Sequence, residues 1–251
     1  MPSTHEIMES LETLFARVSK EADLVYRSLK LPCAKHCSLC CEQLFPVSLV
    51  EAYSVSVHFA ALDRTSRREL QKKAEKISEK LSEKNWNQYQ AFNIDKKTLF
   101  EKRADFAHAL HNTRISCPLL VKNLCSVYSD RPHDCRVHGC SFDATTHELV
   151  ACEKFNDRIK NQPNFYKKLM DFNFLYSELL TLDRNLLTTL TQNTISEKTM
   201  YVTSLYIPIL HDFTQRNWFE FFEKKFSATG KLRSARFSEV PQYHFIVDIH
   251  D

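Results

Sequence analysis

The sequence predicts a mainly α-helical protein with a cysteine-rich loop region at its centre and a short β-hairpin. Apolar residues recur at helical spacing over several long segments, and two of these segments open with a capping box. All nine cysteines lie between Cys33 and Cys152, and the chain after Cys152 contains none. We therefore expect helices to supply the conventional core around loops that carry the thiols.

The composition is that of a folded protein without an obvious polyanionic or membrane partner. A chain of 251 residues suffices for one large domain, or for one core with an extension. A hydrophobic fraction of 43% and a charged fraction of 26% exclude wholesale disorder. The net charge is only +3 and Lys and Arg form no basic stripe, so we expect no nucleic-acid partner. No apolar run approaches the roughly 18 residues of a membrane span, and residues 1–17 lack a signal-peptide core, so we expect a cytoplasmic protein.

The first predicted element is an amphipathic helix over residues 3–30, and we treat residues 1–30 as the first unit of the chain. Ser3 and Glu6 form a capping box at its start, and Pro32 ends it. One face stays apolar at helical spacing through Ile7, Leu11, Leu14, Phe15, Val18, Ala22, Val25 and Leu29.

Further helices are predicted before the second group of cysteines. Ser48 and Glu51 form another capping box, which starts a helix that runs to about Leu62. Ser66 and Glu69 begin a third helix, whose Lys- and Glu-rich face is predicted to be a solvated surface. Residues 98–112 also read as helical, so a helical insertion is expected at about 63–112. The apolar stripe of the third helix is Leu70, Ala74, Ile77 and Leu81.

The first group of cysteines is Cys33, Cys37, Cys40 and Cys41. Disulfides are rare in the reducing cytoplasm, where clustered cysteines usually indicate metal or redox chemistry. Two to three residues between thiols let a short loop wrap a metal ion. The side chains of neighbouring Cys40 and Cys41 diverge, which leaves open two nearby metals, a polynuclear cluster, or one spectator thiol.

The second group begins with Cys117, Cys125 and Cys135, and Cys140 and Cys152 follow. Leu119–Val121 and Cys125–Tyr128 are predicted as short strands around a turn at Lys122 and Asn123. The surplus of thiols suits two zinc ions, or an iron–sulfur cluster with thiols to spare. Thiolate–metal bonds would then hold these loops together, which makes the central region metal-organised.

The combined pattern resembles the CxxCxxCC cysteine-cluster family, the YkgJ-like zinc- or iron-chelating domain. The matching pieces are the run Cys33–Cys41, the helix opening Val47–Ala52, the stretch Cys117–Arg136, and Cys152. The likeness covers about residues 31–160, and flagellin lysine methylases look like distant relatives. The resemblance implies zinc or iron, including an iron–sulfur cluster, and no clear counterpart exists for Cys140. The ligand set it implies is Cys33, Cys37, Cys40, Cys41, Cys117, Cys125, Cys135 and Cys152.

Residues 161–251 are predicted to be a mostly helical extension packed on the same core. Apolar residues are dense from Asn164 to about Leu190, as in one long or two consecutive helices. A helix is expected over Thr214–Phe226, and short strands over Tyr201–Leu210 and Gln242–Ile249. With only two glycines and neither a GxGxxG nor a P-loop motif, a nucleotide cradle of those kinds is excluded.

The sequence thus predicts a protein that binds zinc or an iron–sulfur centre through clustered cysteines, with redox or group-transfer activity left open. The alternatives are a structural zinc module that binds another protein, and a metal-handling protein. No pair of acid and base or nucleophile stands out, so no catalytic residue is predicted. His36, His133 and His138 are each interpreted as surface residues or as neighbours of the ligands, with zinc ligation as the alternative.

Overall fold

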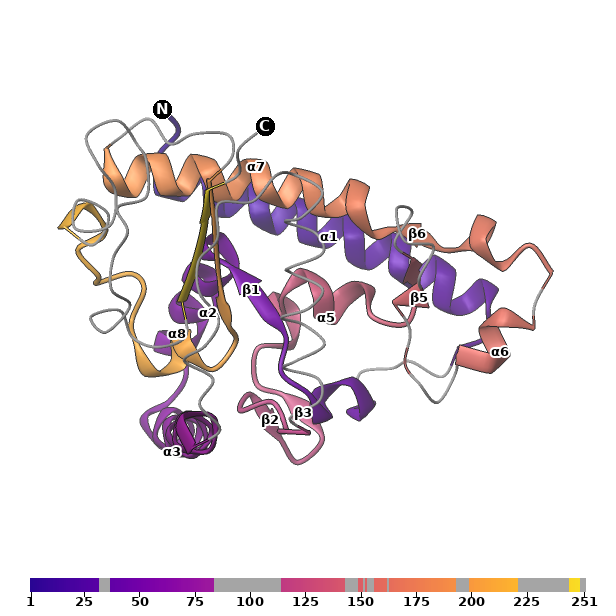
Figure 1. The fold of residues 1–251 in the computed structure, drawn as a ribbon, viewed down its shortest axis with the longest axis horizontal. Coiled ribbons are helices and arrows are strands. Elements are labelled where there is room, and N and C mark those ends of the chain that lie inside the picture. Colours follow the sequence, from indigo (N-terminus) through magenta and orange to yellow (C-terminus); the bar gives the residue numbers. More distant parts are fainter. Residues whose placement is uncertain are drawn as a thin grey trace.

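The computed structural model describes residues 1–31, 37–83, 114–142, 149–150, 152, 156–161, 163–192, 199–220 and 244–248. In these residues the chain is mainly α-helical with a short β-hairpin, as predicted (Figure 1). The helices are α1 (Thr4–Ser28), α2 (Leu49–Ala61), α3 (Arg64–Glu83), α5 (His133–Val137), α6 (Asn156–Lys160), α7 (Phe172–Thr191) and α8 (Ile207–Leu210), with 3-10 helices η1 (Leu39–Glu42), η3 (Tyr128–Asp130) and η5 (Phe165–Lys168).

The two long helices α1 and α7 lie side by side and form the upper layer in Figure 1. The predicted capping box is present at the start of α1, where Ser3 accepts from the Glu6 amide and the Glu6 side chain accepts from the Ser3 amide. The predicted apolar face of α1 is buried from Ile7 to Leu29, and α7 contributes Leu175, Tyr176, Leu179, Leu186 and Leu187 to the same core.

A three-stranded antiparallel sheet joins distant parts of the chain. Strand β1 (Pro46–Ser48) pairs with β7 (Thr199–Ser204), and β7 pairs with β8 (His244–Asp248). The segment that follows the first cysteines is therefore held against strands from the C-terminal part. The strand predicted over Tyr201–Leu210 ends at Ser204, and its second half is instead helix α8, which has a proline in its first turn.

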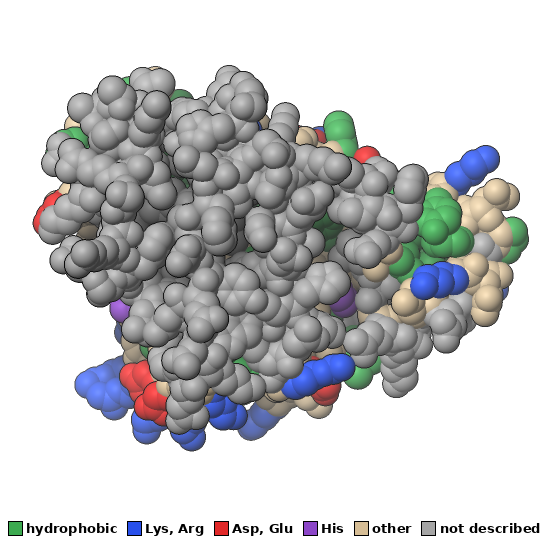
Figure 2. Space-filling view, viewed as in Figure 1, with side chains coloured by type: hydrophobic (Ala, Val, Ile, Leu, Met, Phe, Trp, Pro, Cys, Tyr) green, Lys and Arg blue, Asp and Glu red, His purple; other side chains and the backbone are tan. Residues whose placement is uncertain are grey.

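The third helix begins two residues earlier than predicted. Helix α3 starts at Arg64, because the Asp63 carboxylate accepts hydrogen bonds from the amides of Thr65 at 2.9 Å and Ser66 at 3.0 Å. Its predicted apolar stripe is buried. Figure 2 shows its charged side chains at the lower left, on the solvent-facing side, as expected.

The dense apolar segment after residue 164 contains a short 3-10 helix and one long α-helix, with a strand between them. Asn164 has a φ of 54°, η5 and the strand β6 (Met170–Asp171) follow, and α7 begins only at Phe172. Strand β6 pairs in parallel with β4 (Ser141–Phe142), which also pairs with β5 (Leu149–Val150). These backbone pairings compete with helix formation in the first part of the segment. Of the helix predicted over Thr214–Phe226, residues 218–220 are helical and 221–226 lie outside the described residues, as do residues 98–112.

The predicted hairpin is formed by β2 (Leu120–Val121) and β3 (Leu124–Cys125). Lys122 and Asn123 both have positive φ, of 49° and 63°, which matches the type I′ turn that joins tightly paired strands. The second strand is shorter than predicted, because the chain turns after Cys125 and enters η3 at Tyr128.

No helix in the described ranges is both long enough and apolar enough to cross a membrane.

The capping box of α1 should contribute measurably to stability. Ser3→Ala removes the oxygen that accepts from the Glu6 amide, and we expect a loss of about 1 kcal/mol in the free energy of unfolding. Urea denaturation measures it. The control is Ser10→Ala on the exposed surface of the same helix, where the hydroxyl only bonds back to the Glu6 carbonyl and a change within about 0.5 kcal/mol is expected. Equal stability losses in the two variants would contradict the prediction.

Candidate functional site

Six of the predicted cysteines line one small cavity of about 40 Å³ between the hairpin, η1 and the start of α5. Three of these thiols come from each group of cysteines, so the fold brings together two segments that are far apart in the sequence. The rest of its lining consists of the polar residues Asn123, Tyr128 and Arg131 and of the apolar residues Leu119, Leu120, Pro132 and Leu205. The six cysteines are Cys37, Cys40, Cys41, Cys117, Cys125 and Cys135.

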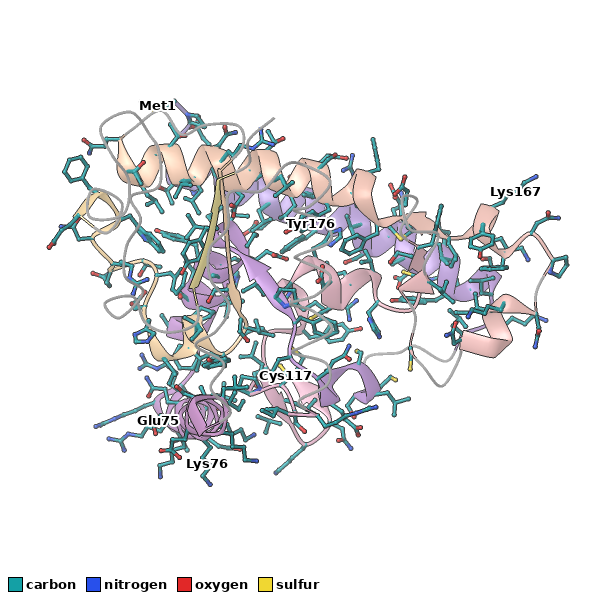
Figure 3. The ribbon with its side chains drawn as sticks, viewed as in Figure 1. Met1, Glu75, Lys76, Cys117, Lys167 and Tyr176 are labelled. Atoms are coloured by element: carbon teal, nitrogen blue, oxygen red, sulfur yellow. The ribbon has the colours of Figure 1, made fainter. Side chains whose placement is uncertain are left out.

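One backbone hydrogen bond joins the two segments, and another closes the hairpin of the second segment. The Cys117 amide donates to the Cys41 carbonyl at 2.7 Å, and the Ser126 amide donates to the Leu119 carbonyl at 2.9 Å. Figure 3 shows Cys117 at the base of the β2–β3 hairpin. The Lys73 ammonium of α3 donates to the Leu120 carbonyl at 2.9 Å, which ties the hairpin to the helical layer. The walls of the cavity are therefore attached to each other and to the core.

Backbone amides also point at two of the sulfurs. The amides of Leu119 and Leu120 hydrogen-bond to the Cys117 sulfur, and the Val127 amide hydrogen-bonds to the Cys125 sulfur. Such bonds favour the thiolate over the thiol. In metal–thiolate centres, hydrogen bonds to sulfur orient the ligands and tune the metal.

The thiols differ in their tendency to ionise. A hydrogen bond from Cys41, followed by the nearby charge of Arg131, lowers the pKa of Cys40 to about 7. The same bond raises the pKa of Cys41 far above its usual range. Burial raises the pKa of Cys117 to about 12 and that of Cys135 well above normal. In the metal-free chain Cys40 is thus the thiolate most easily formed among these four.

Two arginines beside the cavity have different roles. Arg131 lines the cavity, stacks its guanidinium 4.3 Å from the Tyr128 ring centroid, and contributes the positive charge that acts on Cys40. Arg136 is buried and binds backbone and side-chain oxygens of the scaffold: Nε donates to the Arg131 carbonyl, and the other nitrogens donate to Ser19 Oγ and the Ser129 carbonyl. Arg131 is therefore the arginine of the cavity wall that can offset thiolate charge, while the charge of Arg136 acts on Cys125 from outside the wall.

The other described cysteines and histidines near this region do not line the cavity. Cys33 and His36 fall outside the described residues. Cys140 is fully buried, with its sulfur 3.3 Å from the Val137 carbonyl, and Cys152 does not line the cavity. His133 is buried edge-on against Phe172 and Tyr176, and His138 packs edge-on against Phe45, so neither histidine lines it.

The thiols share a cavity but do not form a ready ligand set. Within the ranges that the structure describes, no three His, Cys, Asp or Glu side chains are placed so as to hold one metal ion. Cys33, the fourth predicted ligand of the first group, is not among these residues. The cavity brings six sulfur atoms close together, with amide donors at Cys117 and Cys125 and the Arg131 guanidinium beside them.

A larger groove of about 550 Å³ adjoins the thiol cavity and shares Tyr128 and Arg131 with it. Its other wall is the face of α1 that carries Glu12, Ala16 and Asp23. The volume is within the range of small-molecule sites, whereas the thiol cavity is far too small for an organic ligand.

Several residues that shape the site were not predicted from the sequence. Glu51 was recognised as a helix cap, but its second hydrogen bond, to the His133 amide at 2.6 Å, spans 82 residues. Tyr26 donates from its hydroxyl to the carbonyls of Arg136 and His138. No local pattern identifies such contacts, because the partners approach only when the chain folds.

Comparison of the chain with models of protein families, with curated proteins and with solved structures found no match. The resemblance to the cysteine-cluster family therefore stays a prediction from the motif spacing.

The Cys40–Cys41 bond makes a prediction about reactivity. In Cys41→Ala the hydrogen bond is lost, so the pKa of Cys40 rises from about 7 towards that of a free thiol. We expect alkylation of Cys40 at pH 7 in the reduced, metal-free chain to slow by about fivefold or more, because the thiolate is the nucleophile. Mass spectrometry of the labelled peptide measures the rate. Cys140→Ala removes a thiol outside the cavity and should leave the Cys40 rate unchanged; an unchanged rate in Cys41→Ala would refute the assignment.

Proposed function

We propose that this protein binds zinc or iron, the iron alone or in an iron–sulfur cluster, through the thiols that line the cavity. The observation that carries the proposal is the meeting of six cysteines, from two distant segments, around one space of about 40 Å³. That space suits ions and not organic molecules. Six uncrosslinked thiols in one place also exceed what packing of the core requires.

The surroundings fit a thiophilic metal. Burial raises the pKa of Cys117 and of Cys125, but amide hydrogen bonds at both sulfurs oppose this rise, and the Arg131 charge helps to lower the pKa of Cys40. A bound cation would further favour ionised sulfur, which is the form that binds zinc and iron. Cys37, Cys40, Cys41, Cys117, Cys125 and Cys135 would hold the metal, and Cys33 and Cys152 remain proposed ligands on the motif resemblance. Metal binding is expected to draw the loops together, since preformed sites are rare without the ion.

The adjoining groove favours a second candidate function, a reaction on an organic molecule next to the metal. The groove shares Tyr128 and Arg131 with the thiol cavity, so a molecule in it would be separated from the thiols by these two side chains. A structural zinc module that binds another protein, or a metal-handling protein, needs no such groove.

Metal and acid-labile sulfide content of anaerobically purified protein, together with its visible spectrum, tests the proposal. Iron with sulfide would support a cluster protein and justify a search for substrates in the groove. Zinc without sulfide would support a structural or metal-handling role, and exchange with a mild chelator separates these two. A chain that holds neither metal, and takes up neither when reduced and reconstituted, would overturn the proposal.

A further inference from the structure

Helix α5 carries Cys135 as its third residue and has only five residues, His133–Val137. An isolated helix of this length is not stable in water, because nucleation is costly and few hydrogen bonds form. Its N-cap residue is Pro132, and no side-chain cap bond is present there. The place of the Cys135 sulfur in the cavity wall therefore depends on contacts from other elements.

Such contacts hold α5 at both ends. At the C-terminal end, the Tyr26 hydroxyl from α1 donates to the Arg136 carbonyl at 3.0 Å and to the His138 carbonyl at 3.2 Å. At the N-terminal end, Oε1 of Glu51 accepts from the His133 amide at 2.6 Å. This second contact lies two residues from Cys135 and takes the place of a local cap.

Glu51 can hold α5 because its own position is determined by α2. The side chain is only 3% exposed. Its other oxygen, Oε2, accepts from the Ser48 amide at 2.8 Å and from the Ser48 hydroxyl at 3.0 Å. One carboxylate thus joins the N-terminal ends of two helices, where negative charge is favourable.

We infer that Glu51 is the positioning residue for Cys135: its carboxylate bridges α2 and α5 and sets where that sulfur stands in the thiol cavity. A role of Glu51 in metal binding rests on the proposed function. Its role in placing Cys135 rests only on the hydrogen bonds that join Glu51 to Ser48 and to His133.

The chain offers a matched control at the same helix end. Asp183 of α7 is 1% exposed, and its Oδ1 accepts from the Val50 amide at 2.8 Å. In the described part of the chain its hydrogen bonds go to the start of α2, at Ser48, Leu49 and Val50. Loss of Asp183 therefore removes a buried carboxylate from the same helix end, but leaves in place the hydrogen bonds that join Glu51 to Ser48 and to His133.

The first measurement is the alkylation rate of Cys135 in the reduced, metal-free chain, compared among wild type, Glu51→Ala and Asp183→Ala. Release of α5 in Glu51→Ala should speed labelling of Cys135 severalfold, whereas Asp183→Ala should leave the rate at the wild-type value. Glu51→Gln keeps the side-chain volume and one acceptor, so it should give a smaller increase in the labelling rate of Cys135. This variant replaces Glu51→Ala in the comparison if Glu51→Ala does not fold. Wild-type rates in both Glu51 variants, or equal increases in Glu51→Ala and Asp183→Ala, would overturn the inference.

The second measurement is titration of the same proteins with Co²⁺, followed by the thiolate-to-cobalt charge-transfer absorption. We expect Glu51→Ala to weaken Co²⁺ binding about tenfold or more, as loss of a residue behind a ligand typically does, and Asp183→Ala to bind like wild type. If wild type binds no Co²⁺, the proposed function fails while the alkylation rates still decide the positioning. If all variants bind Co²⁺ equally, the role of Glu51 fails and the proposed function stands.

Discussion

Cys135→Ser should release most of the bound metal and lower the thermal stability of the protein. Cys135 lines the cavity together with five other thiols and stands on a helix held by contacts from α1 and α2. Because a hydroxyl is a poor substitute for a thiolate, the ligand set would be incomplete. Metal binding is coupled to folding, and structural zinc contributes on the order of 10 kcal/mol, so a large effect is expected. Metal per chain and the unfolding temperature of the purified variant measure it, and Cys37→Ser should behave alike.

Cys140→Ser is the matched control for this prediction. Cys140 is fully buried, with its sulfur near the Val137 carbonyl and the Met170 sulfur, and it does not line the cavity. A hydroxyl at this position should cost about 1–3 kcal/mol in the free energy of unfolding, because a polar group is buried, and metal content should be retained. Full metal retention by Cys37→Ser and Cys135→Ser would refute their assignment as ligands.

Asp183→Asn should flatten the pH dependence of stability between about pH 4 and pH 7. Burial raises the pKa of Asp183 from 3.8 to about 7 in the folded protein. In this window the folded state holds a proton that the unfolded state has lost, so the free energy of unfolding falls as the pH rises. About three pKa units correspond to a loss on the order of 4 kcal/mol across the window. Asparagine cannot ionise and keeps the oxygen that accepts from the Val50 amide.

Urea denaturation of wild type and Asp183→Asn from pH 4 to pH 8 measures this difference. The slope of stability with pH is the informative quantity, since Oδ2 of Asp183 has no partner among the described residues and its replacement by an amide nitrogen can change the stability at every pH. Burial also raises the pKa of Glu51, so some pH dependence should remain in the variant. Parallel profiles for the two proteins would show that Asp183 does not titrate in this range.

Much of the helical structure is encoded locally. The capping boxes at Ser3 and Ser48 involve residues three apart, and apolar spacing of 3.6 defines the buried faces of α1 and α3. The turn at Lys122 and Asn123 is likewise a property of two adjacent residues. Such features need no distant partner, which is why the sequence predicts them.

Where distant strands compete with local preference, the predicted helices are interrupted or replaced. The segment from Asn164 reads as one long or two consecutive helices, and it forms the 3-10 helix η5 and then α7, but Met170–Asp171 between them pairs with β4. The chain after Ser204 reads as strand, but it leaves the sheet and turns into α8. Sheet pairing is decided by partners far along the chain, and a short window of sequence does not contain them.

By itself the sequence determined that nine thiols cluster in two segments among amphipathic helices, and that these residue types suit zinc or iron. Only the tertiary structure decided which thiols meet. The Cys117–Cys41 backbone bond and the Glu51–His133 bridge bring six of them to one cavity, and they leave Cys140 in the core and Cys152 away from the cavity. The reason is that spacing along the chain limits which residues one loop can gather, whereas contacts between loops depend on how the helices beneath them pack.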